Sequence, residues 1–287
     1  MKLVGKTKIL VAAVALLTGI TLLAAGCGAK QEAATSTGEV EGTITASGST
    51  ALLPLLKAGQ EEFQKKYAKV TVNISGGGSF TGQNQVAAGA VNIGNSDVGL
   101  QADLKDKGLV EHKLVGIPFV FIVNPDVKVD NLTAQQCVDI LTGKITNWKD
   151  VGGQDEKITI IHRAKSSGSR ATIETVVLKG GNFTDNAVIQ DSNGSVRAGI
   201  ASTPGAIGYV DAAYVDQTVK ALAYNGVKFS VDNVVNGTYP VFTFGRMYTK
   251  GEATGAVKAF IDYVTSTAFQ EAYAEKNGFV PITKLKQ

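Results

Sequence analysis

Three short turns rich in serine and glycine hold the side chains of this sequence that are best suited to binding chemistry. They are Ser47-Gly48-Ser49-Thr50, Ser79 with the glycines before it, and Ser167-Gly168-Ser169. Each is expected at or near a helix start, where backbone N–H groups lack intrahelical partners and carry a partial positive potential. One such turn is typical of an ordinary helix cap. Three of them, with hydroxyl donors and close backbone approach at glycine, predict an oxyanion site.

Two charged residues at the ends of predicted strands add to this site. Arg163 offers a planar fork of five donors suited to an oxyanion, although a salt bridge at a surface or between domains would equally explain its position. Asp97 would repel a fully ionised anion, yet it can accept the proton of hydrogen phosphate. Sulfate brings no proton, so binding it would leave a buried acceptor unpaired at a cost of about 1–3 kcal/mol. Asp97 therefore predicts a preference for a protonated oxyanion.

The apolar periodicity predicts strands that alternate with helices, and these elements would position the turns. Strands are expected at 42–46, 70–75, 90–94, 115–124, 158–163, 206–210 and 241–248. Helices are expected at 51–67, 83–90, 133–142, 170–178, 195–202, 253–263 and 268–276. Residues 115–124 are almost all apolar, which favours a strand buried on both faces. The alternation predicts an α/β fold with largely parallel sheets.

The charge and composition exclude several classes of protein. The 287 residues include 28 Lys and Arg against 25 Asp and Glu, and 44% are hydrophobic. Three lysines are the only charged residues before Cys27, so the remainder carries 25 positive and 25 negative side chains. This balance argues against a nucleic-acid surface, and the apolar fraction argues against disorder. Two cysteines cannot build a disulfide scaffold, and Cys137, in a predicted helix, is expected to be a buried free thiol.

The N-terminus has the features of an export signal. Lysines precede an apolar run over 9–25 that ends in Ala24-Ala25-Gly26-Cys27, a pattern too short for a confident transmembrane helix. Small residues before a cysteine resemble a bacterial lipobox, although Leu23 stands four positions before Cys27 and the commonest pattern has three. Residues 1–26 are therefore predicted to be a lipoprotein signal peptide, with Cys27 acylated, and an ordinary secretory signal is the alternative. Residues 27–40 are small and polar, as in a flexible tether on the extracytoplasmic face of the cell membrane.

Five strings resemble one family and follow its order along nearly all of the chain after Cys27. They are TASGSTALLPLL (45–56), GGGSFTGQNQVAAGAVNIGNSD (76–97), HRAKSSGSRATIE (162–174), PGAIGYV (204–210) and MYTKGEATGAVKAFIDYV (247–264). The sequence resembles the Pst-type phosphate-binding lipoproteins, the substrate-binding proteins of the high-affinity phosphate ABC transporter. The resemblance implies a two-lobed type II periplasmic-binding-protein fold with the ligand in the interdomain cleft. Residues 41–122 and 243–287 would form lobe I and residues 123–242 lobe II, with the chain crossing near 121–126 and 239–244.

The same resemblance implies which residues hold phosphate. The set comprises the Thr50 hydroxyl, the Ala51 N–H, the Ser79 hydroxyl, Asp97 as proton acceptor, Arg163 as charged donor, and Ser167, Gly168 and Ser169, with Ser49 as a further member. No catalytic residue, metal or cofactor is implied. Two positions depart from the family pattern. Lys165 and Ser166 stand where many relatives have an acidic residue or glycine, so no acidic partner for Arg163 is evident, and Ser169 replaces the usual threonine.

The function that the resemblance implies is a monomeric, non-enzymatic receptor that binds inorganic phosphate and delivers it to an ABC permease. A receptor for another oxyanion, such as arsenate, sulfate or molybdate, is one alternative, and Asp97 argues against the fully ionised anions. An exported phosphate-handling enzyme is another, but His112 and His162 have no partner at metal-ligand spacing. No G-x-S-x-G motif indicates a nucleophile either. A sensing or adhesive protein of the same fold is the third.

Overall fold

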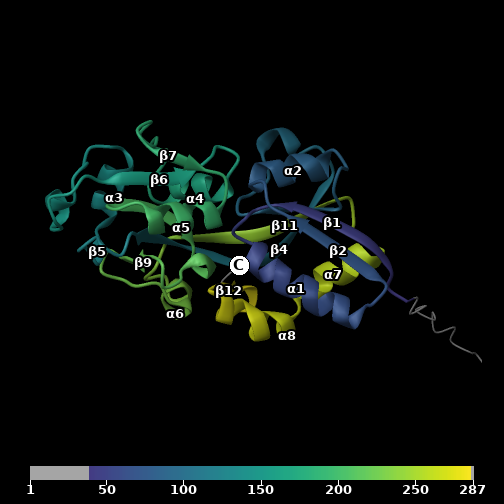
Figure 1. The fold of residues 1–287 in the computed structure, drawn as a ribbon. Helices are drawn as coiled ribbons and strands as arrows, with labels where there is room; N and C mark the ends of the chain where they lie inside the picture. The colour runs from purple at the N-terminus through teal and green to yellow at the C-terminus, as the bar shows by residue number, and fades with distance from the viewer. Residues whose placement is uncertain (1–38, 286–287) are drawn as a thin grey trace, which may run out of the picture. The chain divides into compact units, whose positions relative to one another are not determined.

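Two long antiparallel strands lie at the centre of the main sheet, and one of them connects its two ends. In this computed structural model, which describes residues 39–285, they are β4 (Leu109–Val123) and β11 (Phe242–Lys250). β4 pairs with β11 as far as Pro118 and then, from Phe119, with β8 (Ala206–Asp211). Figure 1 shows β4 running between two groups of elements, with β11 beside it. We call these groups lobe I (39–118 and 242–285) and lobe II (119–241).

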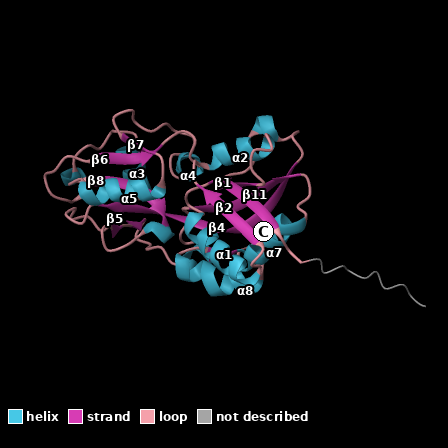
Figure 2. Ribbon diagram, turned by 45° about the vertical axis from the view of Figure 1, so that its right-hand side comes forward, coloured by secondary structure: helices cyan, strands magenta, loops and turns pink. Residues whose placement is uncertain are grey.

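Lobe I places its sheet between helices. Its strand order is β2-β1-β3-β11-β4, and β12 also pairs with β4. The strands are β1 (Gly42–Gly48), β2 (Val70–Ser75), β3 (Ile93–Ser96) and β12 (Val280–Pro281). The helices are α1 (Leu53–Lys66), α2 (Ser79–Ala87), α7 (Gly255–Thr265) and α8 (Thr267–Phe269), with a π-helical turn at Gln270–Ala274 and 3₁₀ turns at Ala102–Leu104, Glu275–Asn277 and Ile282–Lys284. Figure 2 shows the strands flanked by these helices.

Lobe II continues the same sheet in the order β4-β8-β6-β7, with β9 also paired to β4. Its remaining strands are β5 (Asn131–Leu132), β6 (Thr159–Arg163), β7 (Val188–Gln190), β9 (Lys220–Ala221) and β10 (Ala223–Tyr224), of which β5 and β10 form a separate pair. Its helices are α3 (Ala134–Leu141), α4 (Gly168–Val176), α5 (Asn193–Ser202) and α6 (Val231–Val235), with 3₁₀ turns at Trp148–Val151 and Ala212–Tyr214.

The sheet is mixed rather than largely parallel, which corrects the expectation from the sequence. Parallel pairs occur within each lobe, between β1 and its neighbours β2 and β3 and between β6 and its neighbours β7 and β8. The central pairs β3–β11, β11–β4 and β4–β8 are antiparallel. The reason is that β11 runs opposite to both of its neighbours in lobe I, and β4 runs opposite to β8 where it enters lobe II. The predicted lobe limits after residues 122 and 242 stay a prediction, whereas the change of pairing partner in β4 comes after Pro118.

Three helices begin two or more residues earlier than the periodicity indicates; one of them is α5, expected from residue 195, which begins at Asn193. The helix expected from residue 83 begins at Ser79, after Gly78. The helix expected from residue 170 begins at Gly168, where the Ser167 side chain accepts a hydrogen bond from the Arg170 N–H. All three starts are polar, so a search for apolar spacing finds only the later turns of each helix. The strand expected at 90–94 differs in the opposite direction, because it begins later, at Ile93–Ser96.

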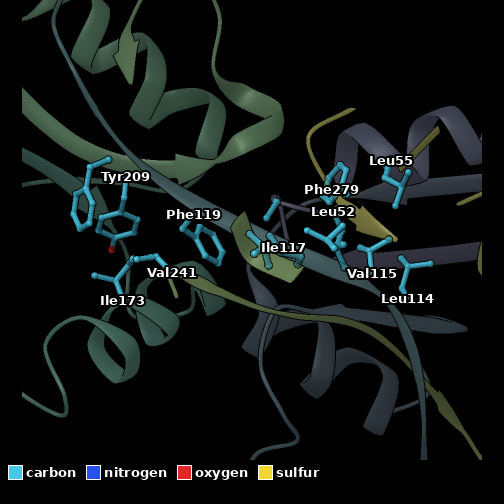
Figure 3. Close-up of a cluster of buried hydrophobic side chains, with 14 of the residues drawn as sticks. Leu52, Leu55, Leu114, Val115, Ile117, Phe119, Ile173, Tyr209, Val241 and Phe279 are labelled. Atoms are coloured by element: carbon cyan, nitrogen blue, oxygen red, sulfur yellow. The ribbon is translucent and has the colours of Figure 1, made fainter. Parts of the chain in front are cut away.

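One apolar cluster follows β4 through both lobes (Figure 3). Every residue of β4 from Leu114 to Val123 is buried, which confirms the prediction of a strand covered on both faces. The labelled side chains of the cluster are Leu52, Leu55, Leu114, Val115, Ile117, Phe119, Ile173, Tyr209, Val241 and Phe279. Its apolar packing is the main source of stability for both lobes.

Cys137 is buried and free, as predicted, and its burial raises the pKa of the thiol to about 12. The predicted signal peptide, Cys27 and residues 28–38 of the predicted tether lie outside the described part of the chain. Within residues 39–285, no helix has both the length and the apolar character needed to cross a bilayer.

Candidate anion-binding site

The predicted site residues are brought together where the two lobes meet. β1 and β3 are parallel neighbours, so the turn after β1 and Asp97 after β3 lie at the same edge of the sheet. Arg163 ends β6 in the other lobe. Asp97 and Arg163 are each 1% exposed. The other members of the predicted set are also buried, namely Ser49, Thr50, Ala51, Ser79, Ser167, Gly168 and Ser169.

Asp97 contacts all three turns. Its Oδ1 accepts a hydrogen bond from the Ser49 hydroxyl. Its Oδ2 accepts one from the Ser169 hydroxyl of lobe II at 3.0 Å. The backbone N–H of Asp97 donates to Ser79 Oγ at 2.9 Å. The carboxyl group is therefore the centre of a network that both lobes complete.

The pKa of Asp97 lies above its usual range because burial disfavours the charged carboxylate. Hydrogen bonds from Ser49 and Ser169 and the positive charges of Arg163 and Arg246 act in the opposite direction. Arg246 lies behind the carboxyl group, with Nη1 3.5 Å from the Asp97 carbonyl oxygen. A buried carboxylate with a raised pKa binds a proton more strongly than an exposed one, which suits it to share a proton with a ligand.

Arg163 is held by backbone carbonyls instead of an acidic side chain. Its Nη2 donates to the Asp191 carbonyl at 2.8 Å, and its Nε donates to the Gln190 carbonyl at 3.3 Å. Its Nη1 lies 3.4 Å from Ser169 Oγ. No salt bridge to Arg163 occurs among residues 39–285. Two carbonyls at the end of β7 thus orient the guanidinium in place of an acidic partner, while Lys165 is exposed.

Two glycines allow the turns to approach their neighbours. A Cβ on Gly168 would lie 2.2 Å from Ser79 Oγ and 2.9 Å from the Asp97 Cβ, so a side chain there would hold the lobes apart. Gly48 has a φ of +132°, and a Cβ on it would lie 2.1 Å from the Asn95 carbonyl oxygen. Both positions therefore require glycine for steric reasons.

The first turn is also contacted from lobe II. Asn193 donates to Thr50 Oγ1 from its side-chain Nδ2 at 3.0 Å and from its backbone N–H at 3.3 Å. The Tyr214 hydroxyl donates to the Thr50 carbonyl at 2.6 Å. The Phe80 N–H of lobe I donates to the Ser166 carbonyl at 3.2 Å. These contacts add to the Ser169–Asp97 bond, so each lobe supplies donors to the other.

Sequence reasoning missed three residues of this region, namely Asn193, Asp211 and Tyr214. Asn193 follows Ser192 at the start of α5, and Asp211 ends β8. The criteria that found the other turns and Asp97 would have found these two residues. Asp211 is fully buried, and its Oδ1 accepts from the Ala213 N–H at 2.8 Å, whereas its Oδ2 has no partner in the described part of the chain.

The described residues offer no cluster of side chains suited to binding a metal ion. Between residues 39 and 285, no group of three or more His, Cys, Asp and Glu side chains is arranged to hold a metal ion. His162 is buried and stacks on Phe183, with their ring centroids 4.3 Å apart. The donors around Asp97 are instead hydroxyls, backbone N–H groups and one guanidinium, which are ligands for an oxyanion.

Comparison with known proteins places the chain among binding proteins. Residues 33–268 match the family model of the PBP superfamily domain. The phosphate-binding protein PstS of Bacillus subtilis is 39% identical over 281 residues, which cover 94% of this chain and 93% of that protein. The PstS of Borreliella burgdorferi is 28% identical over 254 residues, covering 84% of this chain and 91% of that protein.

Solved structures give the same result. A crystal structure of a protein from Clostridium perfringens with bound phosphate superposes with a TM-score of 0.81 and 32% identity, covering 84% of this chain and all of that one (100%). An ABC-type phosphate transport receptor from Vibrio cholerae superposes with a TM-score of 0.67 and 26% identity, covering 83% of this chain and 99% of that one. These likenesses agree with the two lobes joined by β4 and by the segment that leads into β11.

Proposed function

The chain belongs to the PBP superfamily and, within it, to the family of the PstS phosphate-binding proteins, and from this premise we propose that it is a receptor for inorganic phosphate. The receptor works outside the cytoplasm and delivers phosphate to an ABC permease. The observation that carries the proposal is the buried pair Asp97 and Arg163, surrounded by hydroxyl groups from both lobes.

The proposed site combines one charged donor with several neutral donors. Arg163 supplies the positive charge and directional N–H groups. The hydroxyls of Thr50, Ser79 and Ser167 and the N–H groups of Ala51 and Gly168 supply neutral donors. The hydroxyls of Ser49 and Ser169, which donate to Asp97 in this structure, would turn their protons to the anion when it binds. Hydrogen phosphate carries a proton that Asp97 accepts, and the raised pKa of Asp97 favours this sharing. Sulfate would face the same carboxylate without a proton to give, which disfavours it.

Closure of the lobes completes this arrangement. Asp97 and Ser79 belong to lobe I, whereas Arg163 and Ser169 belong to lobe II, so the full set of donors exists only when the lobes meet. β4 passes between the lobes and the chain crosses a second time just before β11, so β4 and the segment that leads into β11 are suited to act as the hinge. Binding and closure are therefore linked, and the closed form is the one a permease would recognise.

The predicted export signal supports a position at the membrane. Acylation of Cys27 would hold it on the cell membrane through the tether, and the monomer would present its lobes to the permease. Metabolic labelling with palmitate tests this: the wild type should incorporate label and Cys27→Ser should not. Equal labelling of both proteins would contradict lipid attachment at Cys27.

No catalytic step is proposed, and the named relatives are binding proteins. Arsenate carries the same proton as phosphate, so it is the one alternative ligand that the Asp97 chemistry favours. Titration calorimetry of the wild type with phosphate, arsenate and sulfate tests the proposal. Phosphate should bind at least about 100-fold more tightly than sulfate, as expected when a buried polar group is left unpaired by the wrong ligand. Equal affinities for phosphate and sulfate would refute it.

A further inference from the structure

The side chain of Asn193 is bonded at both ends, with one end contacting its own lobe and the other contacting lobe I. The residue begins α5 in lobe II and is fully buried. Its Oδ1 accepts a hydrogen bond from the Asp211 N–H at 3.0 Å, and its Nδ2 donates to Thr50 Oγ1 at 3.0 Å. The backbone N–H of Asp211 can only donate, so it determines which end of the amide is the acceptor. The NH₂ group must therefore face Thr50.

This arrangement determines the role of the Thr50 hydroxyl. Its oxygen accepts from Nδ2 and also from the backbone N–H of Asn193 at 3.3 Å, which uses both of its lone pairs. The hydroxyl proton has no acceptor among residues 39–285. Thr50 is only 4% exposed, so water is largely excluded from the hydroxyl. The proton is thus left available to an anion beside it.

We propose that Asn193 is a positioning residue that holds the Thr50 hydroxyl as a donor to the bound phosphate and does so only when the lobes are closed. This inference rests on the proposed function. Asn193 acts through Thr50 and needs no contact of its own with the anion. Lobe II supplies Asn193 and lobe I supplies Thr50, so opening the lobes frees the hydroxyl to turn its proton elsewhere.

Tyr214 supports the same contact from a second side. Its hydroxyl donates to the Thr50 carbonyl at 2.6 Å, which fixes the backbone of the turn while Asn193 fixes the side chain. Both donors belong to lobe II and are 143 and 164 residues from Thr50 in the sequence. We call Asn193 and Tyr214, which both donate to Thr50, the latch. A latch that forms on closure should slow the release of phosphate more than it speeds capture.

A double-mutant cycle tests this role by calorimetric titration of inorganic phosphate. Asn193→Ala should weaken phosphate binding about tenfold, the usual scale for one buried hydrogen-bonded group. Thr50→Val removes the hydroxyl, and adding Asn193→Ala to it should weaken binding less than about twofold further, because residues in contact are not additive. A tenfold loss for Asn193→Ala in both backgrounds would overturn the proposal, since the residue would then act independently of Thr50.

The isosteric variant separates positioning from packing. Asn193→Asp preserves the shape but replaces the donor by an acceptor, so it would draw the Thr50 proton away from the anion. It should bind phosphate more weakly than Asn193→Ala, and its excess loss should shrink in the Thr50→Val background to what its charge alone causes. A purely structural role predicts the reverse order, because alanine would leave a cavity and aspartate would not.

Matched controls keep the outcome interpretable. Ser192→Ala removes the cap of the same helix, where Ser192 Oγ accepts from the Ser195 N–H at 2.9 Å. It should lower thermal stability but leave the phosphate affinity within about twofold. If Asn193→Ala fails to fold, Tyr214→Phe tests the latch: release of phosphate should be several-fold faster, and an unchanged release rate would overturn it. A wild type that binds no phosphate would refute the proposed function and the latch together, whereas additive effects would refute the latch alone.

Discussion

Two buried carboxyl groups stand at strand ends on opposite sides of the contact between the lobes, and they differ in what surrounds them. Asp97, after β3, accepts hydrogen bonds from Ser49 and Ser169 and lies near two arginines. Asp211, at the end of β8, accepts one backbone hydrogen bond and has an oxygen with no partner in residues 39–285. Two aspartates at similar strand ends therefore differ in their hydrogen-bond partners and in the charges near them.

The pKa values follow these surroundings. Burial raises the pKa of both carboxyl groups. Two hydroxyls and two cations counteract the rise at Asp97, whereas only the Ala213 N–H counteracts it at Asp211, and the charge of Asp97 raises it further. The pKa of Asp211 is accordingly well above its usual range. These surroundings suit Asp97 to the proposed exchange of a proton with a ligand, whereas they favour the neutral form of Asp211.

Removing Arg163 should raise the pKa of Asp97 further, toward the behaviour of Asp211. We expect this substitution to have the largest effect on phosphate affinity. Arg163→Ala deletes the charged donor and leaves Asp97 with less positive charge nearby. Breaking a buried charged contact costs about 3–5 kcal/mol, so phosphate should bind several hundred-fold more weakly. Calorimetry measures the affinity, and circular dichroism should still show a folded protein. Unchanged binding would remove Arg163 from the site.

Replacing each carboxyl group by its amide should weaken phosphate binding at Asp97 and leave it almost unchanged at Asp211. Asp97→Asn cannot accept the ligand proton, so phosphate should bind about 100-fold more weakly, as for a lost charged hydrogen bond. Sulfate should bind more tightly than it does to the wild type, because the acceptor is gone. Asp211→Asn is the matched control and should leave phosphate affinity within about threefold, since within residues 39–285 the Asp211 side chain accepts only from the Ala213 N–H and hydrogen-bonds to none of the proposed phosphate donors. A mutant at Asp97 that retains full discrimination against sulfate would assign the proton acceptor elsewhere.

The smallest expected effect concerns stability and pH. A carboxyl group whose pKa is raised by folding contributes stability fully below its ordinary pKa, and this contribution is lost as the pH rises through the raised value. Asp211 should therefore destabilise the wild type at pH 8 relative to pH 5. Asp211→Asn does not titrate, so its melting temperature at pH 8 should exceed that of the wild type by about 3 °C, or about 1 kcal/mol, with little difference at pH 4. An identical pH dependence in both proteins would show that Asp211 is not the titrating group.

Much of the candidate site could be predicted because its signals are local. The serine and glycine turns, Asp97 and Arg163 are visible as polar residues beside apolar strands and helices, and the structure brings all of them together. The helix starts at Ser79 and Gly168 were placed too late, because a cap depends on individual polar residues and not on a repeating pattern. Asn193 and Asp211 carried the same local signals, but nothing in the sequence linked them to Thr50.

By itself, the sequence predicted the chemistry of the site: hydroxyls and N–H donors at helix starts, one guanidinium and one carboxyl group, with 25 positive and 25 negative side chains from Cys27 onward, a balance that provides no long-range attraction for an anion. These features depend on neighbours within a few residues along the chain. The tertiary structure decided the partners. Asn193 reaches Thr50 across 143 residues, and Ser169 reaches Asp97 across 72. β4 changes its pairing partner after Pro118. Such contacts depend on how the lobes pack, because no local pattern encodes which distant turn will face another.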